Sequence, residues 1–414
     1  MAKKSLPKER GRGDLKKIKE KVKTETKPAD SGNFWLFVAA FLGALFMSSS
    51  VIYYVVPAKF QAVEYDLGTP LPLGRRLGRE QTATGLIYTG LKTGLICEID
   101  LYLTKPKITK AVRLTSMKDC DGSYASMAKC GRPLGLRFNE FNELLVVDAY
   151  LGLFAINWDG ENIVKILGAG ELISDDPTAA PIRYLNDFDF LPDGRIVLSE
   201  SSTKFDDHDF LYDMFEHRPN GRLLVYDPRK KDLRILKDGL YFPNGVQVVP
   251  ESGAAKTDDV RVFFSEMGMT RIVALWAPVD HYSKKKIRTK VLIDKLPGYP
   301  DNIRLANDGK LLVPLPSHRT SDDSSMEKNP QVREFITKIL SPQSLQIVFS
   351  YFTNTNGFVL KVDTETGTVT ESFHDPTGKV SSVSIAVDDG KGNLLLGSDD
   401  NYYLARAKIW TFAS

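Results

Sequence analysis

Short, mostly apolar runs follow one another along most of this 414-residue chain, and turn residues separate them. Two typical runs are LLVVD at 144–148 and GRLLVYD at 221–227. Runs of about four to eight residues between turn signals are typical of strands, and almost no stretch after residue 58 shows a helical period. The pattern therefore predicts an all-β domain over residues 57–414.

The strand pattern repeats with a nearly constant period. Asn186 and Asn244, which both stand where an apolar run begins, are 58 residues apart, and Asp301 follows Asn244 after 57 residues. The runs group into six units of about four strands, and such units bury their faces only against their neighbours around an axis. The sequence therefore predicts a six-bladed β-propeller, although five or seven blades also fit the pattern.

One segment interrupts the strands. Residues 322–350 lie between the second and third strands of unit five and place apolar side chains at helical spacing: Val332, Phe335, Ile336, Ile339 and Leu340. This spacing predicts a helical insertion in blade five, which would act as a lid or as a flap that faces a membrane.

Residues 34–56 form an uncharged apolar stretch of 23 residues. About 20 such residues suffice to cross a bilayer as a helix. A cleaved signal peptide is the alternative, but its apolar core of about 7–15 residues follows a short leader, whereas 33 residues precede this stretch. We therefore predict a single transmembrane signal-anchor helix.

The segment before the apolar stretch, residues 1–33, holds 11 Lys or Arg against 5 acidic residues. It has few apolar side chains, which predicts a disordered tail, and the positive-inside rule places that tail in the cytosol. The protein would be a type II membrane protein of the endoplasmic reticulum or plasma membrane, with a lumenal or extracellular propeller. Because the remaining residues carry 44 basic against 47 acidic side chains, nucleic acid is excluded as a partner.

Two of the three cysteines bracket a short polar loop, CDGSYASMAKC, at 120–130. In an oxidising compartment Cys120 and Cys130 would form a disulfide, although they could instead be unpaired neighbours. No Cys or His partners with zinc spacing stand near them. Cys97 lies in the run GLICEID and is interpreted as a small buried hydrophobic residue.

The innermost strands of a propeller converge on its axis, so residues that enter them at equal phase come close together. Counting back from Asn186 by 51 residues reaches Gly135, and a further 55 residues reach Glu80. The blade-entry positions thus include four hard oxygen donors: Glu80, Asn186, Asn244 and Asp301. This ligand set favours Ca²⁺, although a single Asn or Asp before a strand more often makes an Asx turn.

Several segments resemble the strictosidine-synthase-like family: LNDFDFLPDG, GRLLVYDP, FPNGVQVV and LPGYPDNIRL. The resemblance covers nearly all of the chain after the apolar stretch. It implies a calcium-dependent six-bladed propeller with a single-pass anchor, weak arylesterase-like hydrolysis and a Cys120–Cys130 disulfide. It also implies that Glu80, Asn186, Asn244 and Asp301 bind the axial calcium.

The chain departs from this family at the start of the last blade. The plant synthases use a glutamate there, whereas this chain reads SVSI at 382–385, so strictosidine synthase activity is not expected. No Gly-x-Ser-x-Gly nucleophile motif is present and the histidines are scattered. His208 and His217 are predicted to lie in a solvated charged loop, and His318 is a weaker candidate for the pocket.

Two functions fit these features. In the first, the protein is a hydrolase of small hydrophobic aryl esters or lactones, with Asp301 as the catalytic residue and Ca²⁺ polarising the carbonyl. In the second, the propeller is a non-catalytic surface protein that binds extracellular protein partners and contains structural calcium. Both functions place the protein in a membrane through residues 34–56.

Overall fold

The structure is a computed structural model that describes residues 43–44, 46–49, 52–53, 59–60, 62–64, 75–76, 86–101, 106–160, 162–249, 259–278 and 286–408. The chain separates into two units, residues 1–57 and residues 58–414. The predicted tail, most of the predicted membrane helix and Glu80 lie outside the described residues. Among the residues that are described, no helix is long and apolar enough to cross a membrane.

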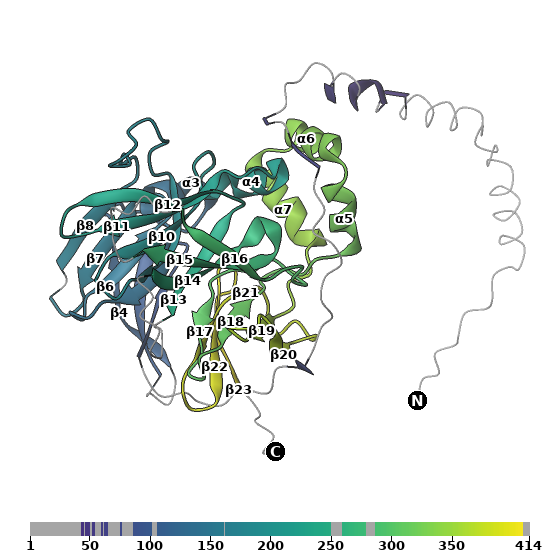
Figure 1. Ribbon diagram of the computed structural model, residues 1–414. Coiled ribbons are helices and arrows are strands. Elements are labelled where there is room, and N and C mark those ends of the chain that lie inside the picture. The colour runs from purple at the N-terminus through teal and green to yellow at the C-terminus, as the bar shows by residue number, and fades with distance from the viewer. Residues whose placement is uncertain are drawn as a thin grey trace, which may run out of the picture. The chain divides into compact units, whose positions relative to one another are not determined.

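Unit 58–414 is a six-bladed β-propeller, and the described residues form six sheets (Figure 1). The first sheet comprises β2 (Leu86–Gly90), β3 (Leu95–Asp100) and β4 (Lys107–Arg113). The second comprises β5 (Pro133–Phe138), β6 (Leu144–Asp148), β7 (Gly152–Asn157) and β8 (Asn162–Gly168). The third comprises β9 (Tyr184–Phe190), β10 (Ile196–Ser202), β11 (Gly221–Asp227) and β12 (Asp232–Leu240).

The fourth sheet comprises β13 (Pro243–Val249), β14 (Asp259–Glu266), β15 (Arg271–Pro278) and β16 (Arg288–Ile293). The fifth comprises β17 (Arg304–Leu305), β18 (Leu311–Pro314), β19 (Phe358–Val362), β20 (Val369–His374) and β1 (Arg75–Arg76). The sixth comprises β21 (Val383–Asp388), β22 (Asn393–Ser398) and β23 (Ala405–Lys408). Neighbouring strands are antiparallel, except that β1 pairs in parallel with β20. The first strands of successive blades contact one another in the order β2, β5, β9, β13, β17, β21. The predicted six blades are confirmed.

The hydrophobic core lies between adjacent blades, and middle strands such as β6, β10, β14 and β18 each contribute to two parts of it. On β10, Leu198 packs into the cluster shared with the preceding blade, whereas Val197 packs into the cluster shared with the following blade. Successive side chains of a strand point to opposite faces, and here both faces are covered. This explains why the middle strands appear in the sequence as continuous apolar runs.

Two glycines let the inner strands approach each other closely. A Cβ at Gly135 would lie 2.8 Å from Asp187 Oδ1, and a Cβ at Gly245 would lie 2.6 Å from the Asp301 carbonyl oxygen. The obstructing atoms at Gly245 belong to the backbone of the next blade, so they cannot rotate away. Glycine is needed at this position because a neighbouring strand occupies the space of a side chain.

We expect Gly245→Ala to lower the free energy of unfolding by about 1–3 kcal/mol, the usual cost of overpacking, because blades four and five must separate to accommodate the methyl group. Denaturant unfolding of the purified protein measures the change. Gly160→Ala is the matched control, since Gly160 is exposed and its nearest neighbouring atom would lie 3.4 Å from the new Cβ. Equal stability of the two variants would contradict the close approach.

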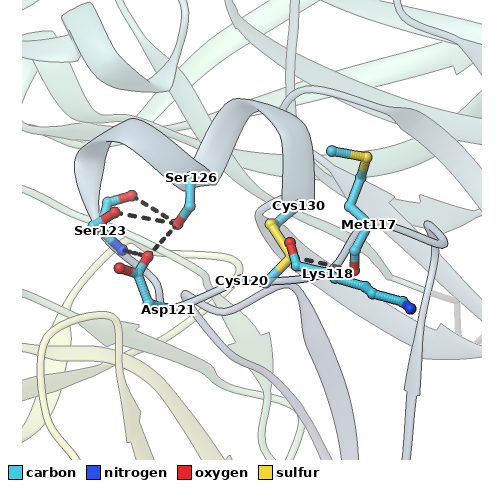
Figure 2. The surroundings of a disulfide bond; sticks show 7 residues. All are labelled: Met117, Lys118, Cys120, Asp121, Ser123, Ser126 and Cys130. Atoms are coloured by element: carbon cyan, nitrogen blue, oxygen red, sulfur yellow. Dashed lines mark hydrogen bonds between the residues drawn. A yellow bond between two sulfur atoms is a disulfide. The ribbon is translucent and has the colours of Figure 1, made fainter.

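The disulfide between Cys120 and Cys130 is present, with the two Cα atoms 5.7 Å apart, which confirms that prediction (Figure 2). Cys130 ends the short helix α3 (Tyr124–Cys130). Asp121 Oδ1 accepts hydrogen bonds from the Ser123 amide at 3.0 Å and from Ser126 Oγ at 2.7 Å. These bonds lower the pKa of Asp121 to about 2. Cys97 is free and buried, as expected.

The insertion in blade five lies between β18 and β19, as predicted, but it contains three helices rather than one. They are α5 (Ser321–Glu327), α6 (Pro330–Ile339) and α7 (Pro342–Phe352). Pro330 and Pro342 stand at the starts of α6 and α7, where a missing amide proton costs nothing, so they divide the segment. On α6, Arg333 and Thr337 are buried whereas Val332 and Ile339 are exposed.

The charged segment around His208 and His217 is not a solvated loop, and this corrects the prediction. It forms the 3-10 helix η1 (Asp207–Asp209) and the helix α4 (Phe210–Glu216), which packs against α6 and α7. His217 ends α4 in a left-handed conformation and is 4% exposed. Burial lowers the pKa of His217 to about 3, so this side chain is neutral at physiological pH.

Candidate metal centre

Three predicted ligands stand where the inner strands begin. Asn186 is the third residue of β9, Asn244 is the second residue of β13, and Asp301 lies just before β17. The pairing of β13 with β14 shifts register between Pro243 and Val246, and β9 shows similar shifts in its pairing with β10. Such irregularities redirect side chains from the sheet faces, which suits residues that must point along the axis.

Buried serines on the second strands join the ligand positions of neighbouring blades. Ser201 Oγ accepts a hydrogen bond from Asn186 Nδ2 at 3.0 Å and donates to the carbonyl of the residue before Asn244 at 2.9 Å. One blade further, Ser265 Oγ accepts from the amide of the residue after Asn244 and donates to the Asp301 carbonyl, both at 2.8 Å. The structure thus brings Asn186, Asn244 and Asp301 into one hydrogen-bonded arrangement.

Two buried amide oxygens in this arrangement have no hydrogen-bond partner: Asn244 Oδ1 and Asn302 Oδ1. Asn302 Nδ2 donates to Asp301 Oδ1 at 3.0 Å and to the Ser384 carbonyl at 3.3 Å, which fixes the orientation of the amide group. A buried carbonyl oxygen without a donor is costly, so such atoms indicate a ligand or water. Both oxygens belong to residues that contact Asp301.

Asn302 was missed by the sequence reasoning. It directly follows Asp301, whereas the sequence repeat predicts only one ligand position at each blade entry. The backbone of Asn302 forms a parallel bridge with Ile385 of the sixth blade. Two consecutive residues therefore approach the axis because the chain crosses between blades before β17 begins. The adjacent polar pair Asp-Asn is the signal that could have revealed this residue.

The carboxyl group of Asp301 is buried close to other acids. Burial raises its pKa well above the usual range, and the charges of Asp399 and Asp187 raise it further. The hydrogen bond from Asn244 and the charge of Arg304 act in the opposite direction but do not compensate. An ionised Asp301 therefore requires additional positive charge, which a bound cation would supply.

Asp187, the neighbour of Asn186 in sequence, is already paired within the protein. Arg304 donates to its two carboxylate oxygens at 2.7 Å and 3.2 Å, and the Val246 amide donates to Oδ2 at 2.9 Å. Arg137 lies on the same carboxylate at 3.5 Å. Because these groups occupy both oxygens of this fully buried side chain, Asp187 is not a candidate metal ligand.

Polar side chains from blades two, three and six form a rim beside this centre. Tyr184 donates a hydrogen bond to Asp207 Oδ1 at 2.8 Å, and Arg132 lies 3.7 Å from Asp207 Oδ2 and 4.0 Å from Asp399 Oδ2. Burial by itself would lower the pKa of Arg132, but Asp207 and Asp399 raise it. Asp399 interacts electrostatically with both Arg132 and Asp301, so the rim adjoins the centre.

His208 and His318 have different surroundings. His208 packs its ring against Tyr124 and Tyr150, with ring centroids 4.2 Å and 5.2 Å away. His318 Nε2 lies 2.7 Å from the Asn356 carbonyl, and its ring packs on Phe358. Burial lowers the pKa of His318. These contacts give His318 a structural role.

Among the described residues, no group of three or more His, Cys, Asp or Glu side chains could hold a metal. The candidate donors at the centre are instead three amides and one carboxylate: Asn186, Asn244, Asn302 and Asp301. Amide and carboxylate oxygens are ligands that Ca²⁺ accepts, and they are poor ligands for softer metals. The residues present thus fit calcium, and Glu80 stays a prediction.

Comparisons with known proteins give three findings. The family model described as strictosidine synthase matches residues 186–279. Adipocyte plasma membrane-associated protein from Salmo salar is 32% identical over 329 residues, which cover 78% of this chain and 73% of that protein. The protein of the same name from Danio rerio is 31% identical over 342 residues, which cover 81% of this chain and 76% of that protein.

Solved structures give a more distant likeness. A gluconolactonase from Xanthomonas campestris is 13% identical and covers 86% of this chain and 99% of its own, with a TM-score of 0.44.

Proposed function

Because the chain belongs to the strictosidine synthase family, together with the adipocyte plasma membrane-associated proteins, we propose that it is a membrane-anchored, calcium-binding propeller that hydrolyses aryl esters or lactones. The observation that carries the proposal is the pair of buried amide oxygens without donors, on Asn244 and Asn302, in contact with Asp301. Oxygen atoms in this state suit a bound water or cation, and the carboxylate of Asp301 beside them favours a cation.

The residues of the centre have distinct roles in this proposal. Asn186, Asn244, Asn302 and Asp301 would hold the ion, together with the predicted ligand Glu80. A bound Ca²⁺ would polarise the ester carbonyl and stabilise the negative charge that develops on its oxygen.

Asp301 is also the proposed general base that takes the proton of the attacking water. A bound cation would offset the burial and the neighbouring acids that raise the pKa of this carboxyl group, and so would favour the ionised form that can accept the proton. The serine bridges keep the centre in place: Ser201 orients the amide of Asn186, and Ser265 holds the backbone of Asp301. The ligand geometry is therefore built before substrate binds, which favours electrostatic catalysis.

The start of the last blade does not support the condensation reaction of the plant synthases. Ser382 stands before β21 with a positive φ of 45°, and β21 begins with Val383 and Ser384. The acidic residue of this strand, Asp388, is at its opposite end. No carboxylate of β21 is therefore placed at the blade entry, so we propose hydrolysis without strictosidine synthase activity.

The proposed membrane anchor is residues 34–56, with the basic tail in the cytosol and the propeller in the lumen or outside the cell. It is supported by the uncharged stretch of 23 residues and by the charge asymmetry of the flanking segments. The relatives from Salmo salar and Danio rerio are named plasma membrane-associated.

Calcium is expected to stabilise the protein against thermal unfolding. An ion that binds only the native state adds about 2.7 kcal/mol when its concentration is a hundred times Kd. The full-length protein in detergent should melt at a lower temperature with chelator than with calcium, while magnesium should restore little. Asn302→Ala should weaken the calcium effect, and Asn162→Ala, which changes an exposed asparagine of β8, should leave it intact.

Calcium-independent melting of metal-stripped protein would overturn the site. Hydrolysis is tested separately by aryl-ester turnover across a calcium titration. Turnover no faster than that of free calcium in buffer would overturn the enzymatic function and favour a binding protein with structural calcium.

A further inference from the structure

The outward face of helix α7 is apolar. This helix, PQSLQIVFSYF, contains no charged residue. Its exposed apolar side chains are Ile347 at 55%, Val348 at 39%, Tyr351 at 82% and Phe352 at 78% exposure, and we call these four residues the α7 face. Gln343 and Ser350 of this helix are exposed as well. Ile347 and Tyr351, like Val348 and Phe352, are four residues apart, and Val348 and Tyr351 are three apart, so the four side chains cover one broad side of the helix.

The opposite side of α7 already has its partners. Leu345 is buried in a cluster with residues of α4, and Phe349 packs its ring against Phe215 with centroids 6.2 Å apart. The α7 face is thus not needed to hold the helix on the propeller. Adjoining exposed apolar side chains of this size on a folded surface indicate an interaction site.

The chain that follows the apolar stretch packs on the same helices. Phe60 belongs to the same hydrophobic cluster as Leu345 and contacts the rings of Phe205 and Tyr212 edge-on. The Ala62 amide donates to Glu334 Oε1 of α6 at 2.8 Å. This segment is therefore attached both to α6 of the insertion and to the α4 region of blade three, which packs against α6 and α7.

The length of chain between these two features is short. The apolar stretch ends at Val56, four residues before Phe60. Four residues span at most about 14 Å when fully extended. A membrane that holds residues 34–56 therefore begins within about 14 Å of Phe60, next to the helices that carry the α7 face.

We propose that the α7 face inserts into the interfacial layer of the membrane that holds residues 34–56, so that its partner is a phospholipid bilayer. The proposal rests on the proposed anchor, and it adds a second membrane contact from the propeller unit itself. Tyr351 has an apolar ring and a polar hydroxyl group, which suit the boundary between headgroups and acyl chains. A helix that lies in the interface buries its apolar side to about 5–10 Å, which matches side chains that project from a helix surface.

A tryptophan placed on the α7 face tests this contact. The full-length Tyr351→Trp protein is reconstituted into phosphatidylcholine vesicles with or without bromine atoms in the upper acyl chains. We expect brominated lipid to abolish most of the fluorescence that the new tryptophan adds relative to the parent protein. Phe141→Trp is the matched control, because Phe141 is 75% exposed in the turn between β5 and β6, and its added fluorescence should not change.

Each outcome has one meaning. Loss of fluorescence at position 351 alone supports docking, whereas no loss at either position, or equal loss at both, overturns it. A tryptophan at 351 that is shielded from aqueous iodide but unaffected by bromine would indicate a second copy of the protein and would also overturn it. Carbonate extraction tests the anchor separately, and none of these measurements depends on calcium or ester turnover.

Discussion

Replacing Asp301 with asparagine is expected to reduce aryl-ester turnover by more than about 10²-fold at saturating calcium, the usual lower range for the loss of a general base. Asparagine keeps an oxygen donor and nearly the same shape, but it cannot accept the proton of the attacking water. It also removes the negative charge that the cation would balance in this buried position. The loss should therefore persist however much calcium is added.

Asn244→Ala is the matched comparison for this experiment. Asn244 contributes a neutral amide oxygen, and its removal should mainly weaken calcium binding, so that turnover recovers as calcium is raised. Initial rates of aryl-ester hydrolysis across a calcium titration distinguish the two variants. Full activity of Asp301→Asn at saturating calcium would exclude the catalytic role of Asp301.

Replacing Arg304 with leucine is expected to lower the free energy of unfolding by about 3–5 kcal/mol, the range observed when one partner of a buried ion pair is removed. Arg304 donates to both carboxylate oxygens of Asp187, which is fully buried. Arg137 lies 3.5 Å from Asp187 Oδ2 and cannot reproduce this two-point contact. Denaturant unfolding measures the change.

Two further variants test this explanation. Arg229→Leu removes a 67% exposed arginine side chain from its pair with the buried carboxylate of Asp227, and it should cost no more than about 1 kcal/mol because Asp227 keeps the hydrogen bond from the amide of residue 229. In the Arg304→Leu background, Asp187→Asn should restore part of the lost stability, because asparagine removes the unpaired charge and can still accept from the Val246 amide. A cost at Arg304 as small as that at Arg229 would contradict the importance of the buried pair.

The regular features of this protein could be predicted from neighbouring residues alone. Strand length, turn residues and the spacing of 58 and 57 residues between Asn186, Asn244 and Asp301 predicted six blades and placed the three residues at inner strands. The same local evidence located the disulfide and the insertion between β18 and β19. These predictions succeeded because a propeller repeats one local unit, so that position within the repeat determines position around the axis.

Features that depend on distant partners could not be predicted in this way. The segment around His217 was interpreted as a solvated loop because it is rich in charge. However, Leu211 and Phe215 are buried in a cluster that α7 also joins, and Arg333 of α6 donates to the Phe215 carbonyl. The three helices of the insertion lie more than a hundred residues further along the chain. Because α6 and α7 pack against α4, this charge-rich segment forms a buried helix.

The sequence by itself determined the all-β architecture, a repeat that favours six blades and the residue types available at the blade entries, because these follow from local periodicity. The tertiary structure decided which polar groups near the axis are paired within the protein and which oxygen atoms have no donor. Only closure of the ring places Arg304 on Asp187, 117 residues away, and leaves the oxygens of Asn244 and Asn302 without donors. The reason is physical: a buried polar atom is satisfied or left free by whichever blade packs beside it, and that partner is not adjacent in sequence.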